Sequence, residues 1–201
     1  MATAMAAQAV DPSNRPQDLR EIRAWLKEIV RDLEPERLTG KGAARLVAEF
    51  AAIKNIAAAG ETLCAGRVAD SGAWQSSGEK TAAHWMAKTT GTSVGSAVAA
   101  LETAARLPEL PATDRALRTG KLSDVQAKEI ASAAAASPVA EKKLLEVAER
   151  DSLHGLKETC AKVKAAALPD ENARYARIHE RRRLRHWTDH DGAFRLDALL
   201  T

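Results

Sequence analysis

Arginine residues near the C-terminus are the side chains of this sequence that most clearly suggest a chemical function. Five arginines lie between Arg177 and Arg185, with Glu180 as the one acidic residue among them. The last 28 residues hold seven arginines and four acidic residues, whereas the other 173 residues hold 23 basic and 23 acidic residues. The net charge of +3 therefore comes entirely from residues 174–201. Such a local excess indicates a polyanionic partner more strongly than the overall pI does.

The arginine cluster and the indole beside it are the first candidates for a nucleic-acid contact. The candidate residues are Arg181, Arg182, Arg183, Arg185 and Trp187. Guanidinium groups suit bidentate contacts with phosphate, and on a strand these four would divide between its two faces. Trp187 would either stack on a base or pack on the protein body. The alternative interpretation is a solvated strand whose arginines pair with acids of the helical body, such as Glu171 and Glu180.

Two stretches that resemble a helix-turn-helix offer weaker candidates for DNA contact. In HWMAKTTGTSVGSAVAALETA, Gly91 occupies the turn and a second helix follows from Ser93. The face that this second helix would expose is poor in cations, and it carries Ser93, Ser96, Glu102, Thr103 and, at its far end, Arg106. In LRTGKLSDVQAKEI the available cations are Lys121 and Lys128. Either stretch is also what a plain helical hairpin of a bundle requires.

Histidine and aspartate residues near the C-terminus invite a metal interpretation, which their spacing does not favour. The residues are His179, His186, Asp189, His190 and Asp191. They match no standard zinc pattern, and no cysteine lies near them. Asp and Gly residues there suit a turn. The sequence also offers no phosphate-binding glycine loop and no nucleophile that can be placed beside a base. We therefore predict no catalytic residue, no metal site and no cofactor.

The composition predicts the elements that must position these residues. Apolar residues make up 45% of the chain and aromatic residues only 3%. Alanine-rich helices that approach closely are the packing this composition favours. We predict a mainly α fold, a multi-helix bundle with a short C-terminal β-hairpin. The expected parts are a disordered leader over 1–16, a helical domain over 17–180 and the hairpin over 181–201.

The first predicted helix, residues 17–33, is amphipathic. Apolar residues recur along it at steps of three and four, with Trp25 beside them: Leu19, Ile22, Leu26, Ile29, Val30 and Leu33. One continuous apolar stripe on a helix indicates a packing surface. This helix could therefore serve as the contact for a partner protein or for a homo-oligomer.

Caps and breakers predict the remaining helices. Thr39 caps a long helix to about residue 72, whose buried side would hold Leu46, Phe50, Ile53, Ala57, Cys64 and Val68. Gly60 and Gly66 would weaken this helix or permit a close crossing. Further helices are expected to follow Ser77, Ser93, the LPELP segment, the Ser123–Gln126 capping box and Ser137–Pro138. Another is expected over about 153–167, and a last one is expected to begin at Pro169 and Asp170.

The chain ends with two alternating runs around Asp191–Gly192, which predict a β-hairpin. A lone hairpin is marginal in water. We therefore expect that the hairpin lies on the helical body, or that the functional unit continues beyond Thr201 and this chain is a truncated form.

Cysteine usage and hydropathy suggest a cellular compartment. Cys64 and Cys160 are far apart in helix-like sequence, so we expect two buried, reduced thiols. The N-terminus has neither a basic region nor a long apolar run, and no stretch approaches the ~18 apolar residues of a membrane span. We expect a cytoplasmic protein without a membrane partner.

Three segments together resemble a known family. The first segment links AAHWMAKTTG, LPELPAT and ALRTGKLSDVQAKEI; the second is LLEVAERDSLHGLKETCAKVKAAALPDE; the third is the arginine-rich strand with its Asp-Gly turn. From about residue 38 to its end, the chain resembles domain-of-unknown-function family 222, which is common in actinobacteria. The resemblance implies a helical domain placed before a C-terminal HNH endonuclease module, which would bring a divalent metal.

The expected function follows from that resemblance and from what the chain lacks. An HNH site needs a histidine general base and further metal ligands, and the chain offers no such set. We expect a DNA-associated helical module of an HNH-endonuclease-type protein without the catalytic part. The alternatives are a protein-interaction or oligomerisation module with no nucleic-acid role and, if a catalytic part is present, an active nuclease.

Overall fold

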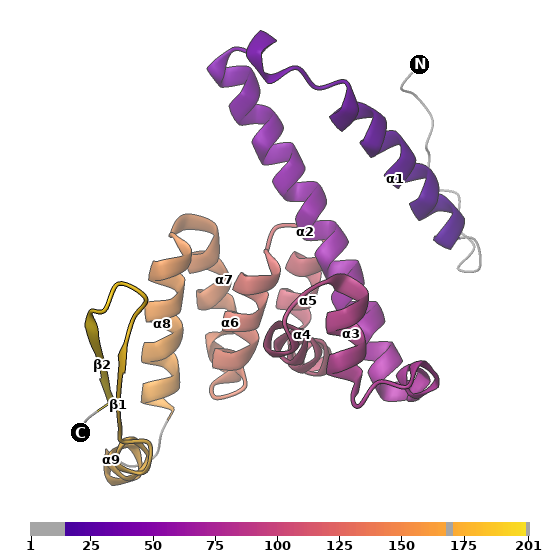
Figure 1. Ribbon diagram of the computed structural model, residues 1–201. Helices are drawn as coiled ribbons and strands as arrows, with labels where there is room; N and C mark the ends of the chain where they lie inside the picture. The colour runs from indigo at the N-terminus through magenta and orange to yellow at the C-terminus, as the bar shows by residue number, and fades with distance from the viewer. Residues whose placement is uncertain (1–14, 168–170, 200–201) are drawn as a thin grey trace. The chain divides into compact units, whose positions relative to one another are not determined.

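The computed structural model describes residues 15–167 and 171–199, and the chain is mainly α-helical with a C-terminal two-stranded hairpin, as predicted (Figure 1). In order, the elements are α1 Arg15–Arg31, η1 Pro35–Arg37, α2 Gly40–Ser71, η2 Ala73–Ser77, α3 Ala82–Thr90, α4 Val94–Arg106, η3 Leu107–Glu109, α5 Pro111–Arg118, α6 Asp124–Ala134, η4 Pro138–Ala140, α7 Glu141–Arg150, α8 Leu153–Ala166, α9 Glu171–Glu180, β1 Arg183–Thr188 and β2 Phe194–Leu199. Of the predicted leader 1–16, residues 1–14 lie outside the described part. The expected helix start at Pro169 and Asp170 lies outside it too.

The chain divides into two compact units between Glu49 and Phe50, within the predicted helical domain 17–180. The first unit contains α1, η1 and the beginning of α2. Thr39 caps α2 as expected, because its hydroxyl accepts a hydrogen bond of 3.1 Å from the backbone N–H of Gly42. The second unit contains the rest of α2 and all later elements. Among the helices that the structure describes, none combines the length and apolar character needed to cross a membrane.

The core of the second unit lies mainly where α6 packs against α7 and α8. Its buried side chains are Leu122, Ile130, Ala133, Leu144, Ala148, Leu156 and Cys160. A smaller cluster joins α2, α3 and α4 through Ala65, Ala83, Met86, Ala87 and Ala97. Alanine side chains at these contacts let the helix axes approach closely, as the composition predicted.

The buried face of α2 differs from the predicted one. Ala59, Thr62 and Ala65 are buried, whereas Ile53 and Cys64 are exposed. A Cβ placed on Gly66 would lie 2.9 Å from the Cβ of Ala104 in α4, so Gly66 permits the close crossing that was expected. The neighbouring Gly60 has no atom within 4 Å of such a Cβ. The prediction was based on the large apolar residues of α2, whereas its small residues are the ones that pack against the neighbouring helices.

Predicted side-chain caps are present at three helix starts, at Thr39 of α2, Ser93 of α4 and Ser123 of α6. The hydroxyl of Ser93 accepts from the N–H of Ser96, and Ser123 with Gln126 forms the complete capping box. Ser152, which was not predicted as a cap, caps α8 in the same way. Two predicted caps are wrong. Ser77 belongs to η2 and Thr81 caps α3 instead, while Ser137 makes no side-chain cap and Pro138 starts a 3-10 turn.

The two thiols occupy opposite environments, which corrects the expectation that both are buried. Cys64 is exposed on α2, and Cys160 is fully buried in the core on α8. Burial raises the pKa of the Cys160 thiol, and the nearby Glu129 raises it further. Because the thiolate is the reactive form, both effects lower the reactivity of Cys160.

We expect one of the two thiols to react rapidly in the folded protein. With a disulfide reagent such as DTNB in native buffer, Cys64 should be modified quickly and Cys160 only at the rate at which the core opens. In denaturant, both thiols should react at once. A Cys64→Ser variant serves as the control and should lose the rapid phase alone. Rapid modification of two thiols per chain in the native wild type would contradict the buried position of Cys160.

Candidate nucleic-acid interface

The hairpin pairs β1 and β2 in antiparallel register around a five-residue turn, residues 189–193. Arg183 pairs with Leu199, Arg185 with Asp197, and Trp187 with Arg195. Because side chains alternate along a strand, these six residues share one face of the ribbon. We call this set the basic face: Arg183, Arg185, Trp187, Arg195, Asp197 and Leu199.

The basic face is open to solvent and carries more positive than negative charge. All residues of β1 are exposed, and the Trp187 side chain retains 49% of its accessible area. Arg183 donates to Asp197 at 3.1 Å, within the hairpin rather than to an acid of the helical body. In the part of the chain that the structure describes, Arg185 makes no ion pair. The face therefore presents a cation and an indole side by side.

The predicted division of the four arginines between the two strand faces is wrong. Arg181 and Arg182 precede β1, and Arg182 donates to the backbone carbonyl of His179 at 3.3 Å. Arg183 and Arg185 lie within the strand two residues apart, so they share a face. Sequence reasoning also missed Arg195, which completes the basic face from β2. The alternating pattern around Arg195 was visible, but the length of the turn sets the register that places it opposite Trp187.

The opposite face of the ribbon is apolar and exposed. Leu184, Phe194 and Leu196 retain 60–68% of their accessible area. The imidazole of His186 stacks on Phe194 with ring centroids 5.6 Å apart. The hairpin is therefore amphipathic, with arginines on one face and apolar groups on the other.

Hydrogen bonds to the Asp189 carboxylate organise the hairpin turn. Its carboxylate accepts from Arg195 Nε at 2.7 Å and from the backbone N–H groups of Ala193 and Asp191 at 2.9 and 3.1 Å. The hydrogen bond from Arg195, followed by that from Ala193, holds the pKa of Asp189 below its usual range. No group of three metal-ligating side chains occurs within residues 15–167 and 171–199. The Asp189 side chain thus has a structural role in the turn.

Lys121 belongs to the turn between α5 and α6, away from the arginine strand in the sequence. Gly120 before it adopts a left-handed conformation with φ of 73°, and Asn55 of α2 donates to the Gly120 carbonyl at 3.2 Å. A hollow of about 250 Å³ borders Lys121, together with Arg115 and Glu149. Two cations and one carboxylate therefore line this hollow.

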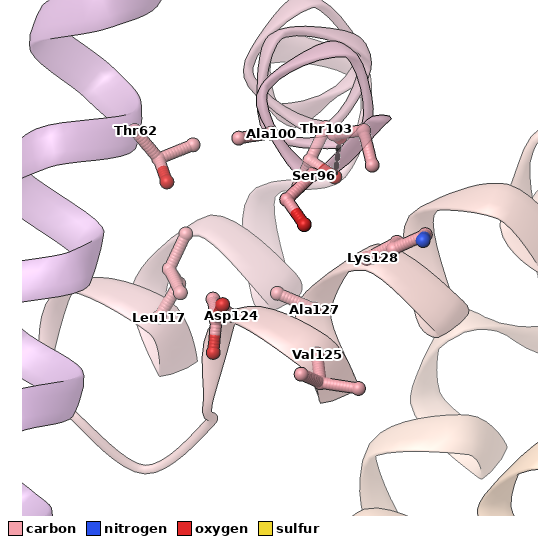
Figure 2. A pocket seen from close by; sticks show the side chains of 10 residues that line it. Thr62, Ser96, Ala100, Thr103, Leu117, Asp124, Val125, Ala127 and Lys128 are labelled. Carbon is pink, nitrogen blue, oxygen red and sulfur yellow. Dashed lines mark hydrogen bonds between the residues drawn. The ribbon is translucent and has the colours of Figure 1, made fainter. Parts of the chain in front are cut away.

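Lys128 borders a different hollow, formed by α2, α4, α5 and α6. Figure 2 shows the hydroxyls of Thr62 and Ser96 turned toward this space above the start of α6. Its volume is about 110 Å³, smaller than the roughly 300–1,000 Å³ of ordinary ligand pockets. Asp124 on the same rim offsets the charge of Lys128. The hollow is therefore a poor site for a nucleotide, and Lys121 and Lys128 border separate hollows.

The α3–α4 pair has the expected helix-turn-helix outline. Gly91 ends α3 with φ of 72°, and α4 begins after the Ser93 cap. Ser96 and Glu102 are exposed as predicted, but Thr103 is buried and donates to the Ala99 carbonyl at 2.8 Å. The exposed face of α4 therefore holds even fewer polar groups than the sequence suggested.

The structure is thus that of a module of capped, alanine-packed helices followed by an exposed, basic two-stranded hairpin. Residues 44–201 match the family described as Domain of unknown function (DUF222). This match covers most of the chain, and the chain belongs to that family. No curated protein and no solved structure matches the chain.

Proposed function

We propose that this chain is a DNA-associated helical module that contacts DNA through the basic face of its C-terminal hairpin. The observation that carries the proposal is the presence of Arg183, Arg185 and Trp187 together on one exposed face. A two-stranded ribbon has the width that the major groove of B-DNA admits. The arginines would bind phosphates or guanine edges, and Trp187 would pack on sugar or base.

The distribution of charge favours the hairpin over the two helix-turn-helix-like stretches. Phosphate neutralisation by Lys and Arg supplies most of the non-specific affinity for DNA. The net charge of the chain comes from residues 174–201, whereas the exposed face of α4 offers hydroxyls and Glu102. Lys121 and Lys128 would add secondary contacts from the α5–α6 region.

The proposed role is placement of DNA for a nuclease. The family resemblance implies an HNH endonuclease module in the same protein, and a divalent metal would belong to that module. The helical module and its hairpin would hold the duplex and leave the cleavage to the other module. Such a role would place the protein in the cytoplasm, with DNA as its partner.

The test is salt-dependent binding of a fluorescently labelled duplex to the whole chain. Replacing Arg183 and Arg185 together by alanine should weaken binding and reduce the slope of log K against log salt by about 2. The matched control removes two exposed arginines from the helical body, Arg67→Ala with Arg150→Ala, at the same loss of net charge. This control should leave the slope nearly unchanged.

Two results would contradict the proposal. One is an absence of wild-type binding at low salt. The other is an equal loss of affinity in the hairpin and control variants, because net charge alone would then explain binding.

A second function is favoured by a different observation, the exposed apolar stripe on α1. This stripe supports the alternative of a protein-interaction or oligomerisation module. Its leucine and isoleucine side chains suit a partner helix with an apolar stripe of the same kind.

A further inference from the structure

Helix α1 carries an apolar stripe that the described residues of the first unit leave largely open, with Leu26 half-buried. Leu19, Ile22, Trp25, Ile29 and Val30 retain between 43% and 72% of their accessible area, and no residue of α1 is buried. Exposed large apolar groups that form a continuous stripe mark an association surface.

The stripe has the period of a coiled coil. Leu19, Ile22, Leu26 and Ile29 follow one another at steps of three, four and three within α1, and Leu33 continues the pattern two residues beyond the end of the helix. These steps define positions a and d of a heptad, with leucine at each a position and isoleucine at each d position. The e positions of α1 then hold Arg23 and Val30, and its g positions hold Asp18 and Trp25; Asp32, the next residue with this spacing, follows the end of the helix.

We propose that α1 assembles three or four copies of this chain into a parallel helical bundle. The apolar stripe of each copy would thus pack against the same stripe of the other copies. This inference is independent of DNA binding, because it involves neither the hairpin nor its arginines.

The flanking charges favour the parallel orientation. In a parallel, in-register pair, each g residue faces the e residue five positions further along the neighbouring helix. Asp18 then faces Arg23 of the neighbouring copy, and Trp25 faces its Val30. One pair has opposite charges and the other is apolar, so both are compatible with the interface.

The antiparallel orientation brings like charges together. With the helices fully overlapped, g residues face g residues and e residues face e residues. Arg23 then faces its own counterpart, and Asp18 faces Asp32, which lies one residue beyond the end of α1 in the neighbouring copy. Repulsion at these positions disfavours this arrangement.

The order of the core residues sets the number of copies. Leucine at a with isoleucine at d favours trimers and tetramers over dimers. Trp25 and Val30 also widen the apolar surface beyond the a and d positions. A wider surface is needed where each helix contacts two neighbours rather than one.

The experiment measures the mass of the whole chain in solution by sedimentation and light scattering over a concentration series. The expected mass at high concentration is three or four times the chain mass of 21.5 kDa. Ile22→Asp should produce a monomer. The matched control, Ala24→Asp, places the same charge on the outer side of the same helix and should leave the assembly intact. Circular dichroism melting of the whole chain checks that each variant remains folded.

Charge variants test the orientation. Asp18→Arg should shift the dissociation midpoint to higher concentration, because the substituted guanidinium would face Arg23 of the neighbouring copy in the parallel bundle. Adding Arg23→Asp should restore the midpoint. A wild type that stays monomeric or dimeric overturns the proposal, as does equal disruption by Ala24→Asp and Ile22→Asp. Stronger association of Asp18→Arg overturns the parallel orientation.

Discussion

Gly120→Ala is expected to lower the free energy of unfolding by about 2–4 kcal/mol, measured by urea denaturation. Gly120 has φ of 73°, a conformation that a Cβ disfavours. A Cβ at this position would lie 2.7 Å from Cγ1 of Ile56 and 3.1 Å from the backbone oxygen of Ala52. Backbone strain and a collision with α2 therefore act together.

A matched substitution separates the strain from the collision. Gly91 has φ of 72°, and no atom lies within 4 Å of its added Cβ. Gly91→Ala should therefore report the strain alone, about 1–2 kcal/mol. Equal losses for the two variants would contradict a close approach between α2 and the α5–α6 turn.

A second variant locates the collision. The side chain of Ile56 is half exposed, so Ile56→Ala alone should cost little. In the Gly120→Ala background it should restore part of the lost stability, because it removes the closest contact. The contact with the Ala52 oxygen would remain, since backbone cannot withdraw without disturbing α2.

Local sequence predicted most of the fold because caps and turns depend on neighbouring residues. Ser93, Ser123 and Gly91 act where the sequence placed them. The prediction that Ser77 caps α3 was wrong, because two residues that can cap a helix lie within four positions of each other. The Ser77 hydroxyl donates to the Trp74 carbonyl at 2.6 Å, so Thr81 is left to cap α3.

Packing between distant helices was less predictable than their positions in the sequence. Side-chain size suggested the wrong face for α2, because the contact with α4 selects small residues such as Ala65 and Gly66. A long-range cap was missed as well. The Glu141 carboxylate accepts from the N–H and hydroxyl of Thr113 at 2.7 and 2.8 Å, across 28 residues. No local sequence pattern predicts such a hydrogen bond.

The sequence predicted most residues of the candidate interface, but it did not predict how they are arranged. The arginine cluster and Trp187 were evident from charge and composition. Their arrangement depends on where β1 begins and on the turn that fixes the register. These two features exclude Arg181 and Arg182 from the strand and bring Arg195 onto the basic face.

Leu156→Ala is expected to lower the free energy of unfolding by about 3 kcal/mol, within the 2–5 kcal/mol typical of such changes. Leu156 is fully buried on α8, among Ile130, Leu144 and Cys160. Removing its side chain leaves a cavity where α6, α7 and α8 meet, in addition to the lost burial of apolar area. The matched control is Leu153→Ala on the same helix. Because Leu153 is exposed, this substitution should lower the free energy of unfolding by less than about 1 kcal/mol.

Cys160 reports this loss from within the same core, one helical turn from Leu156. In a Cys64→Ser background, slow modification of Cys160 measures how often the core opens. A loss of about 3 kcal/mol should accelerate this modification on the order of 100-fold, because each 1.4 kcal/mol changes the open population tenfold. Leu153→Ala should leave the rate within about fivefold of the Cys64→Ser parent. An unchanged rate in Leu156→Ala would show that Cys160 reacts through a local opening that leaves the contact with Leu156 intact.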